Sequence, residues 1–143
     1  MILKLSILTR DREGSTAIEF AILAPAIFAL LFGVFQVGIG MQAKNAMRSI
    51  GAETARYAVV EYQTGNEVTD AAIKTWAENT ATSSPYLLGN SFSAQVTPVA
   101  TPRVDGTFEK SLTLTYQPPA VVPFVSSVSP TLTYTRPIFV LAE

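Results

Sequence analysis

Residues 20–41 read FAILAPAIFALLFGVFQVGIGM, a run from Phe20 to Met41 in which the only polar side chain is Gln36. As an α-helix rising 1.5 Å per residue, this run is roughly 33 Å long and matches a bilayer hydrocarbon core of about 30 Å. The run therefore predicts a membrane-spanning helix. A secretory signal peptide is the competing interpretation, but its apolar region usually spans only about 7–15 residues. A signal-peptide cut after Ala43 would also place Met41 at the outer specificity position, where it fits poorly.

The sequence after this run continues as a helix that leaves the membrane. Residues of one face recur at three- and four-residue spacing: Ala43, Met47, Ile50, Thr54, Tyr57, Ala58 and Glu61. This period predicts one helix from the span to about Tyr62, ended by Gly65-Asn66.

A second, shorter helix is expected next. Thr69 is its N-cap and Asp70 suits its first turn, where a negative charge faces the positive end of the helix dipole. Its apolar side consists of Ala72, Ile73, Trp76 and Ala77. We expect Trp76 and Tyr57 to pack between the two helices rather than to bind a ligand.

The last part of the chain, residues 81–143, has the pattern of antiparallel strands. Apolar and polar residues alternate at 92–96, 111–116 and 131–135, and proline or glycine separates these runs. Val104-Asp105-Gly106-Thr107 predicts a hairpin turn before the middle strand. Pro118-Pro119 and Pro123 require a non-helical connection, and Pro137 is expected to bend or end the last strand.

The fold class predicted is therefore α+β. It comprises a long N-terminal helix with a membrane-spanning and an extramembrane half, a short second helix, and a small antiparallel β-meander packed on the long helix.

Composition argues against several function classes. The 143 residues include no cysteine and no histidine, charged residues make up 15%, and the formal net charge is −1. Thiol or Ser-His catalysis and zinc sites built on these residues are excluded, and no basic face indicates nucleic acid. The acidic residues are scattered without metal-loop spacing, and a solvated hairpin accounts for Asp105-Gly106 near Glu109. We therefore expect no enzyme, no metal and no cofactor.

The junction before the apolar run carries the functional signal. Residues 10–20 read RDREGSTAIEF, so a charged leader ends at Gly14 and a lone carboxylate, Glu19, stands about one turn into the helix. An ionisable side chain costs about 2.5–3.5 kcal/mol at the centre of a membrane helix, less near its ends, and usually has a partner. A structural alternative is a capping box, with Thr16 as N-cap and Glu19 at the third helical position.

The same string resembles the processing site of type IV prepilins and pseudopilins, in which a dedicated peptidase cuts after glycine and the mature chain has glutamate fifth. The cut would fall between Gly14 and Ser15, which makes Glu19 the fifth residue. The small residue at the new N-terminus, the Glu19-Phe20 pair and Ala24-Pro25 resemble the TadE-like minor pseudopilins of the tight-adherence (Flp/Tad) pilus system. The long C-terminal domain fits these better than the much shorter major Flp pilins.

The resemblance implies a pseudopilin-like fold and a division of the chain. Residues 1–14 would be a cytoplasmic leader removed by the prepilin peptidase, 15–43 the transmembrane and assembly helix, and 44–143 an extracytoplasmic α+β domain. Gly14 and Ser15 would form the processing site, and Glu19 and Phe20 would act in assembly. Pro25 removes a helix hydrogen bond and is expected to kink the span, and a kinked helix would repack more easily in a fibre. The alternative is that Pro25 has no special role, because membrane helices ordinarily tolerate proline.

The expected partners are the prepilin peptidase, other pilins and minor pseudopilins, an inner-membrane assembly platform and membrane lipid. Positive charges do not decide the orientation, because three precede the span (Lys4, Arg10, Arg12) and three closely follow it (Lys44, Arg48, Arg56). The resemblance implies a cytoplasmic N-terminus and a periplasmic domain in a bacterial inner membrane, with incorporation in the pilus as a further step. The alternative function is an unprocessed, single-span, membrane-anchored ligand-binding or adhesion protein.

Overall fold

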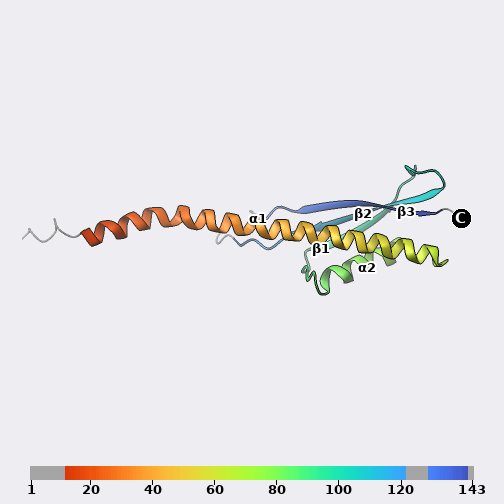
Figure 1. The fold of residues 1–143 in the computed structure, drawn as a ribbon, viewed down its shortest axis with the longest axis horizontal. Helices are drawn as coiled ribbons and strands as arrows, with labels where there is room; N and C mark the ends of the chain where they lie inside the picture. Colours follow the sequence, from red (N-terminus) through yellow and green to blue (C-terminus); the bar gives the residue numbers. More distant parts are fainter. Residues whose placement is uncertain (1–11, 122–128, 142–143) are drawn as a thin grey trace, which may run out of the picture.

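The computed structural model describes residues 12–121 and 129–141. One very long helix carries a small domain along its C-terminal half, while its N-terminal half extends away from that domain (Figure 1). The elements in chain order are α1 (Arg12–Gln63), α2 (Asp70–Thr82), β1 (Phe92–Pro98), β2 (Thr107–Tyr116) and β3 (Leu132–Leu141). The predicted α+β class is confirmed. Most of the predicted leader, residues 1–14, and also Pro123 lie outside the described residues.

α1 ends where the sequence predicts, through a Schellman motif. Gly65 has a positive φ of 76°, a conformation that glycine adopts without strain. The Asn66 N–H donates to the Glu61 carbonyl at 3.0 Å, and the Gly65 N–H donates to the Tyr62 carbonyl at 3.1 Å. These two bonds satisfy carbonyl groups that the last turn of a helix otherwise leaves unpaired.

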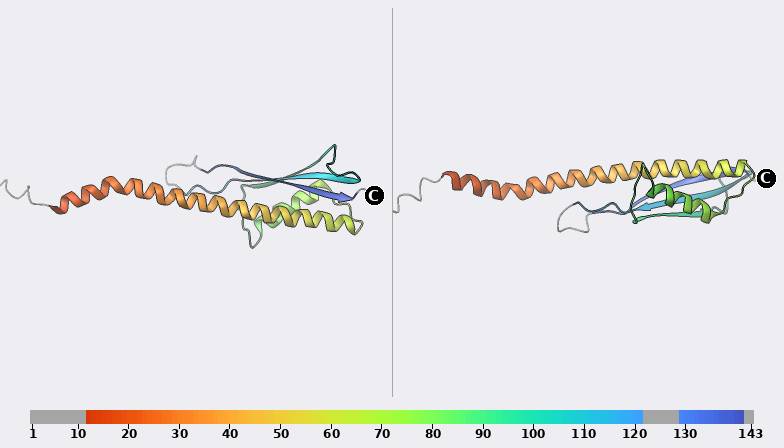
Figure 2. Two further views of the ribbon diagram at one scale, coloured as in Figure 1. Left: turned by 45° about the horizontal axis from the view of Figure 1, so that its top comes forward. Right: turned by 90° about the horizontal axis from the view of Figure 1, so that it is seen from below.

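α2 begins at the predicted cap and packs against α1 (Figure 2). The Ala72 N–H donates to the Thr69 hydroxyl at 3.2 Å, and Asp70 lies in the first turn. Ile73, Ala77 and Ala81 of α2 are buried. The rings of Tyr57 and Trp76 stack with centroids 4.9 Å apart and planes 6° apart, which confirms that they pack between the two helices.

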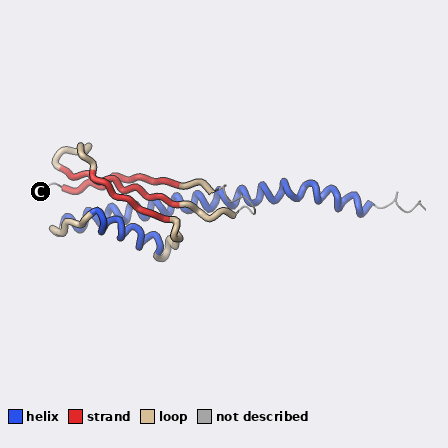
Figure 3. Tube along the Cα trace, turned by 180° about the vertical axis from the view of Figure 1, so that it is seen from behind, coloured by secondary structure: helices blue, strands red, loops and turns tan. Residues whose placement is uncertain are grey.

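The strands form an antiparallel meander in the order β1-β2-β3, lying against both helices (Figure 3). In its register Leu114 pairs with Ala94 on one side and with Tyr134 on the other. The predicted alternation is confirmed, because Leu112, Leu114 and Tyr116 are buried while the residues between them are partly exposed. α1 packs mainly against β3, and α2 packs mainly against β1.

Pro137 does not end the last strand, so that alternative was wrong, and a bend at Pro137 stays a prediction. β3 continues through Pro137, which pairs with Ser111, as far as Leu141. The reason is the position of β3 at the edge of the sheet. An edge strand has one side on which no neighbour needs an N–H group, so it tolerates proline.

The core lies between the C-terminal half of α1, α2 and the sheet. Its fully buried side chains are Met47, Ile50, Thr54, Ile73, Leu112, Leu114 and Ile138. Thr54 satisfies its hydroxyl by donating to the Ile50 carbonyl at 2.7 Å. Gly51 allows the closest approach, because a Cβ at this position would lie 2.8 Å from Cε1 of Tyr134 on β3.

Candidate assembly site on the N-terminal half of α1

The N-terminal half of α1 exposes apolar side chains around its whole circumference. The large exposed residues of this half are Ile18, Phe20, Ile22, Leu23, Ile27, Phe28, Leu30, Leu31, Val34 and Phe35. By length and composition this stretch qualifies α1 as a candidate membrane span. A helix that is apolar all round needs lipid or neighbouring helices to cover it. This half is therefore a surface for lipid or for other helices.

Gly14, Ser15 and Glu19 lie on exposed turns at the start of this half. The Ser15 hydroxyl donates to Oε1 of Glu19 at 3.2 Å, so the two side chains share one side of the helix, one turn apart. A Cβ added at Gly14 would meet nothing within 4 Å. Among residues 12–121 and 129–141, no side chain encloses the backbone at Gly14.

The capping-box interpretation of this turn was wrong. α1 begins at Arg12, so Thr16 lies inside the helix and cannot be its N-cap. Residues preceding Thr16 already adopt the helical conformation, and the glycine at position 14 does not interrupt it. The expectation that the helix starts after Gly14 is corrected in the same way.

Phe20 and Pro25 complete the set of predicted site residues on α1. Phe20 follows Glu19 directly and is exposed. Pro25 lies within α1, and the helix continues on both sides of it. Roles for Phe20 in assembly and for Pro25 in kinking the span stay predictions.

Gln36 has a role that its sequence position did not reveal. Its side chain is buried, although it belongs to the apolar run. Its Nε2 donates to the Pro119 carbonyl at 3.3 Å, and its Oε1 accepts from the Val121 N–H at 2.8 Å. Both polar ends of the amide are therefore bonded to the connector between β2 and β3. Only the presence of a lone amide in an apolar run hinted at such a contact.

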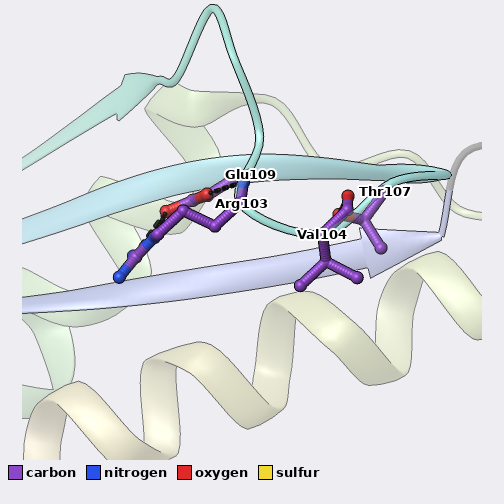
Figure 4. Close-up of polar contacts among 4 residues, drawn as sticks. All are labelled: Arg103, Val104, Thr107 and Glu109. Atoms are coloured by element: carbon purple, nitrogen blue, oxygen red, sulfur yellow. Dashed lines mark hydrogen bonds and ion pairs between the residues drawn. The ribbon is translucent and has the colours of Figure 1, made fainter.

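Glu109 is not part of a solvated hairpin, contrary to the expectation from sequence. Its side chain is only 3% exposed and accepts hydrogen bonds from the backbone N–H and the guanidinium of Arg103 (Figure 4). The side-chain hydrogen bond from Arg103, followed by the backbone bond, lowers the pKa of Glu109. The turn itself forms as predicted: Gly106 has a φ of 74°, and the Thr107 hydroxyl donates to the Val104 carbonyl at 2.7 Å.

Lys110, the next residue of β2, points to the opposite face of the sheet from Glu109 and joins three elements. Its Nζ lies 2.7 Å from Oδ1 of Asp70 at the start of α2, and 5.3 Å from the centre of the Tyr62 ring on α1. Burial lowers the pKa of Lys110, but hydrogen bonds with Asp70 and Tyr62 outweigh burial and raise it overall. Lys110 and Glu109 thus each hold a structural partner.

Within residues 12–121 and 129–141, no group of three or more Asp and Glu side chains is placed to hold a metal ion. The buried charges of the domain serve contacts between its own elements. The features of the described chain that need a partner from outside are thus concentrated on the N-terminal half of α1.

A comparison with protein families found a similarity in this part of the chain. Residues 14–56 match the family model described as TadE-like protein. This match confirms the resemblance drawn from the residues around Gly14, and it begins at Gly14 and includes the whole apolar half of α1. No curated protein and no solved structure matches the chain.

Proposed function

Because residues 14–56 are TadE-like, as in components of the Tad pilus system, we propose that the chain is a minor pseudopilin. In this role it is a structural and assembly subunit of a Flp/Tad-type pilus or a related secretion apparatus. The observation that carries the proposal is the N-terminal half of α1, whose large apolar side chains are exposed. This half projects from a folded domain and bears the Ser15–Glu19 pair at its start. The proposal includes no catalytic step.

The proposed processing event is a cut between Gly14 and Ser15 by a prepilin peptidase. A peptidase needs an extended backbone at the bond it cuts, so the first turns of α1 must open. Glycine weakens a helix by about 1 kcal/mol relative to alanine, which makes opening at Gly14 easier. The open space around Gly14 also supports access.

Glu19 is proposed to set the height of the subunit in the assembly. Cleavage would place a positively charged amino group on Ser15, one turn before Glu19 and at the end of the helix whose dipole favours negative charge. The Ser15–Glu19 hydrogen bond supports this geometry, because it places both residues on the same side of α1. In a wrongly placed subunit this carboxylate would lose its pairing with its own or a neighbour's amino terminus. The two charges left without partners would disfavour the wrong register.

The proposed location follows from the proposed processing. Prepilin peptidases act at the cytoplasmic face, so the leader would be cytoplasmic and residues 44–143 periplasmic, with one span in the inner membrane. Other pilins, minor pseudopilins and the assembly platform would then contact the apolar half of α1, with Phe20 beside Glu19 in that contact.

The N-terminus of the mature protein tests processing. The protein should begin at Ser15 in cells that contain the peptidase, and Gly14→Leu should retain the full leader, because a bulky side chain obstructs the backbone approach at the cut. N-terminal sequencing or intact mass measures both. An intact leader on the wild-type protein in peptidase-containing cells would refute the proposal and favour an unprocessed membrane-anchored adhesion protein.

A matched pair of substitutions tests the role of Glu19. Glu19→Gln removes its charge but keeps the length of the side chain, whereas Glu13→Gln removes a charge that would leave with the leader. Both variants should insert and be cut, but only Glu19→Gln should fail to co-purify with partner pilins and to support fibres. Glu19→Asp, which keeps the charge with a shorter reach, should be intermediate. Normal fibres with Glu19→Gln would exclude the assembly role.

A further inference from the structure

The connector between β2 and β3 extends from the sheet along α1 toward its apolar half (Figures 1 and 3). Its described parts, residues 117–121 and 129–131, are bonded to each other and to the rest of the domain. Gln117 donates to the Ser129 carbonyl at 3.1 Å, and Ser129 donates to the Pro118 carbonyl. Ser91 donates to the Gln117 carbonyl at 2.7 Å. Residues 117–121 and 129–131 are therefore held against the rest of the domain at the level of Gln36.

This position conflicts with a span that reaches Met41. Irregular backbone does not occur facing lipid in the hydrocarbon region, because its N–H and C=O groups would lack partners there. Pro119 and Ala120 are exposed, and they lie beside Gln36, whose amide holds the residues on either side of Ala120. The level of Gln36 must then lie outside the hydrocarbon.

The apolar part of α1 that precedes Gln36 is long enough to cross the membrane without residues 36–41. Residues 15–35 span roughly 32 Å as a helix, against a hydrocarbon core of about 30 Å. This placement also puts Glu19 near the inner boundary, where an ionisable group costs less than at the centre.

We propose that the outer boundary of the hydrocarbon core lies at Gln36 and that the membrane-facing end of the domain rests on the lipid headgroups. The contact surface consists of Val37 and Met41 on α1 and Pro119 and Ala120 of the connector. The partner is the lipid surface itself. This inference rests on the proposed membrane insertion of α1, and it moves the outer end of the span from Met41 to Gln36.

Leu87 lines a pocket next to the connector. It is 71% exposed and has a φ of 51°, a left-handed conformation that is unfavourable for leucine. The pocket, of about 600 Å³, is lined on α1 by residues from Ile39 to Ser49 and on the connector by Pro119.

Single cysteines test the boundary directly, because the chain contains no cysteine of its own. Leu30→Cys, Val34→Cys, Val37→Cys and Met41→Cys are the variants. The four native side chains are similarly exposed in the protein, at 73%, 72%, 62% and 64%, so differences in labelling must come from the bilayer. Full-length variants are reconstituted in phosphatidylcholine–phosphatidylglycerol vesicles and treated with a membrane-impermeant maleimide. Each labelling rate is divided by the rate of Thr97→Cys, a single-cysteine variant on the exposed sheet surface that is reconstituted in the same way. This ratio corrects for the fraction of molecules that face the inside of the vesicles.

Val37→Cys and Met41→Cys should label at least about tenfold faster than Leu30→Cys and Val34→Cys, because the reactive thiolate forms readily only in contact with water. Ala120→Cys should label like Met41→Cys. All variants should react equally after solubilisation in denaturing detergent.

The possible failures are distinguishable. Protection of Val37→Cys, with or without protection of Met41→Cys, overturns the boundary at Gln36 while leaving membrane insertion intact. Rapid labelling of Leu30→Cys overturns membrane insertion and with it the proposed function. Protection of Ala120→Cys would place the connector in the hydrocarbon and also overturn the inference.

Discussion

Replacing Lys110 with methionine tests how the domain is joined to the helices. The substitution keeps most of the buried alkyl chain but removes the ammonium group, which lies 2.7 Å from Asp70. The Lys110 side chain is 12% exposed and that of Asp70 is 38% exposed, so the pair lies between a surface and a buried ion pair. Exposed pairs contribute about 0.2–1 kcal/mol, and breaking a fully buried pair costs about 3–5 kcal/mol. After allowance for solvent screening at Asp70, we expect a loss of about 1–2 kcal/mol in the free energy of unfolding.

The assay is thermal unfolding of the full chain in detergent micelles, followed by the fluorescence of Trp76, the only tryptophan. A loss of this size in a domain of this length lowers Tm by roughly 5–10 °C. The control is Lys74→Met on α2, because Lys74 and Glu78 form an i,i+4 pair at 3.9 Å on the surface. This control should cost at most about 0.5 kcal/mol.

A double-mutant cycle with Asp70→Asn isolates the pair from the effect of Asp70 on the dipole of α2. The coupling free energy should be about 1 kcal/mol in favour of the native pair. If Lys110→Met lowers Tm no more than Lys74→Met, or if the coupling is zero, Lys110 does not join the three elements as described.

Three further predictions concern pH dependence, the approach of α1 to β3, and the backbone at Leu87. Because the folded-state pKa of Glu109 is lowered, its contribution to stability should be present above about pH 4.3, the value of an unperturbed glutamate, and be lost as the pH falls through the lower folded value. Because the folded-state pKa of Lys110 is raised, its contribution should be full below about pH 10.4, the value of an unperturbed lysine, and be lost as the pH rises through the higher folded value. Tm measured against pH checks both limbs, and an acid limb unchanged in Glu109→Gln would contradict the first. Gly51→Ala should lower the free energy of unfolding, measured in urea, by about 1–3 kcal/mol, because the added Cβ collides with Tyr134. This loss should appear although alanine has the better helix propensity, and the added substitution Tyr134→Leu should recover much of it. Leu87→Gly should stabilise the domain by about 1 kcal/mol, because glycine adopts the positive φ without strain, and so should raise Tm in detergent. An unchanged or lower Tm would argue against strain at this residue.

Local signals predicted most of the helical structure correctly. The end of α1 at Gly65-Asn66 and the start of α2 at Thr69 depend on hydrogen bonds within a few residues, so the responsible residue types can be recognised in the sequence. The alternation that predicted the three strands likewise reflects one buried face, which residues along each strand share. The apolar run from Phe20 to Met41 predicted a membrane-spanning helix from its length and composition, and by the same two properties α1 qualifies as a candidate span.

The incorrect and missing predictions concern two kinds of residue. Some have partners that are distant in the chain, and others depend on the position of their strand in the sheet. Pro137 is tolerated because β3 is an edge strand, and strand order is not written in the local pattern. Lys110 and Gln36 gain their roles from Asp70 and Val121, which come together only when the sheet docks on the helices. The start of α1 at Arg12, ahead of the expected glycine boundary, likewise has no marker in the local sequence. The chemistry of a side chain determines which kind of partner it needs. The free energy of packing whole elements together determines which partner it contacts.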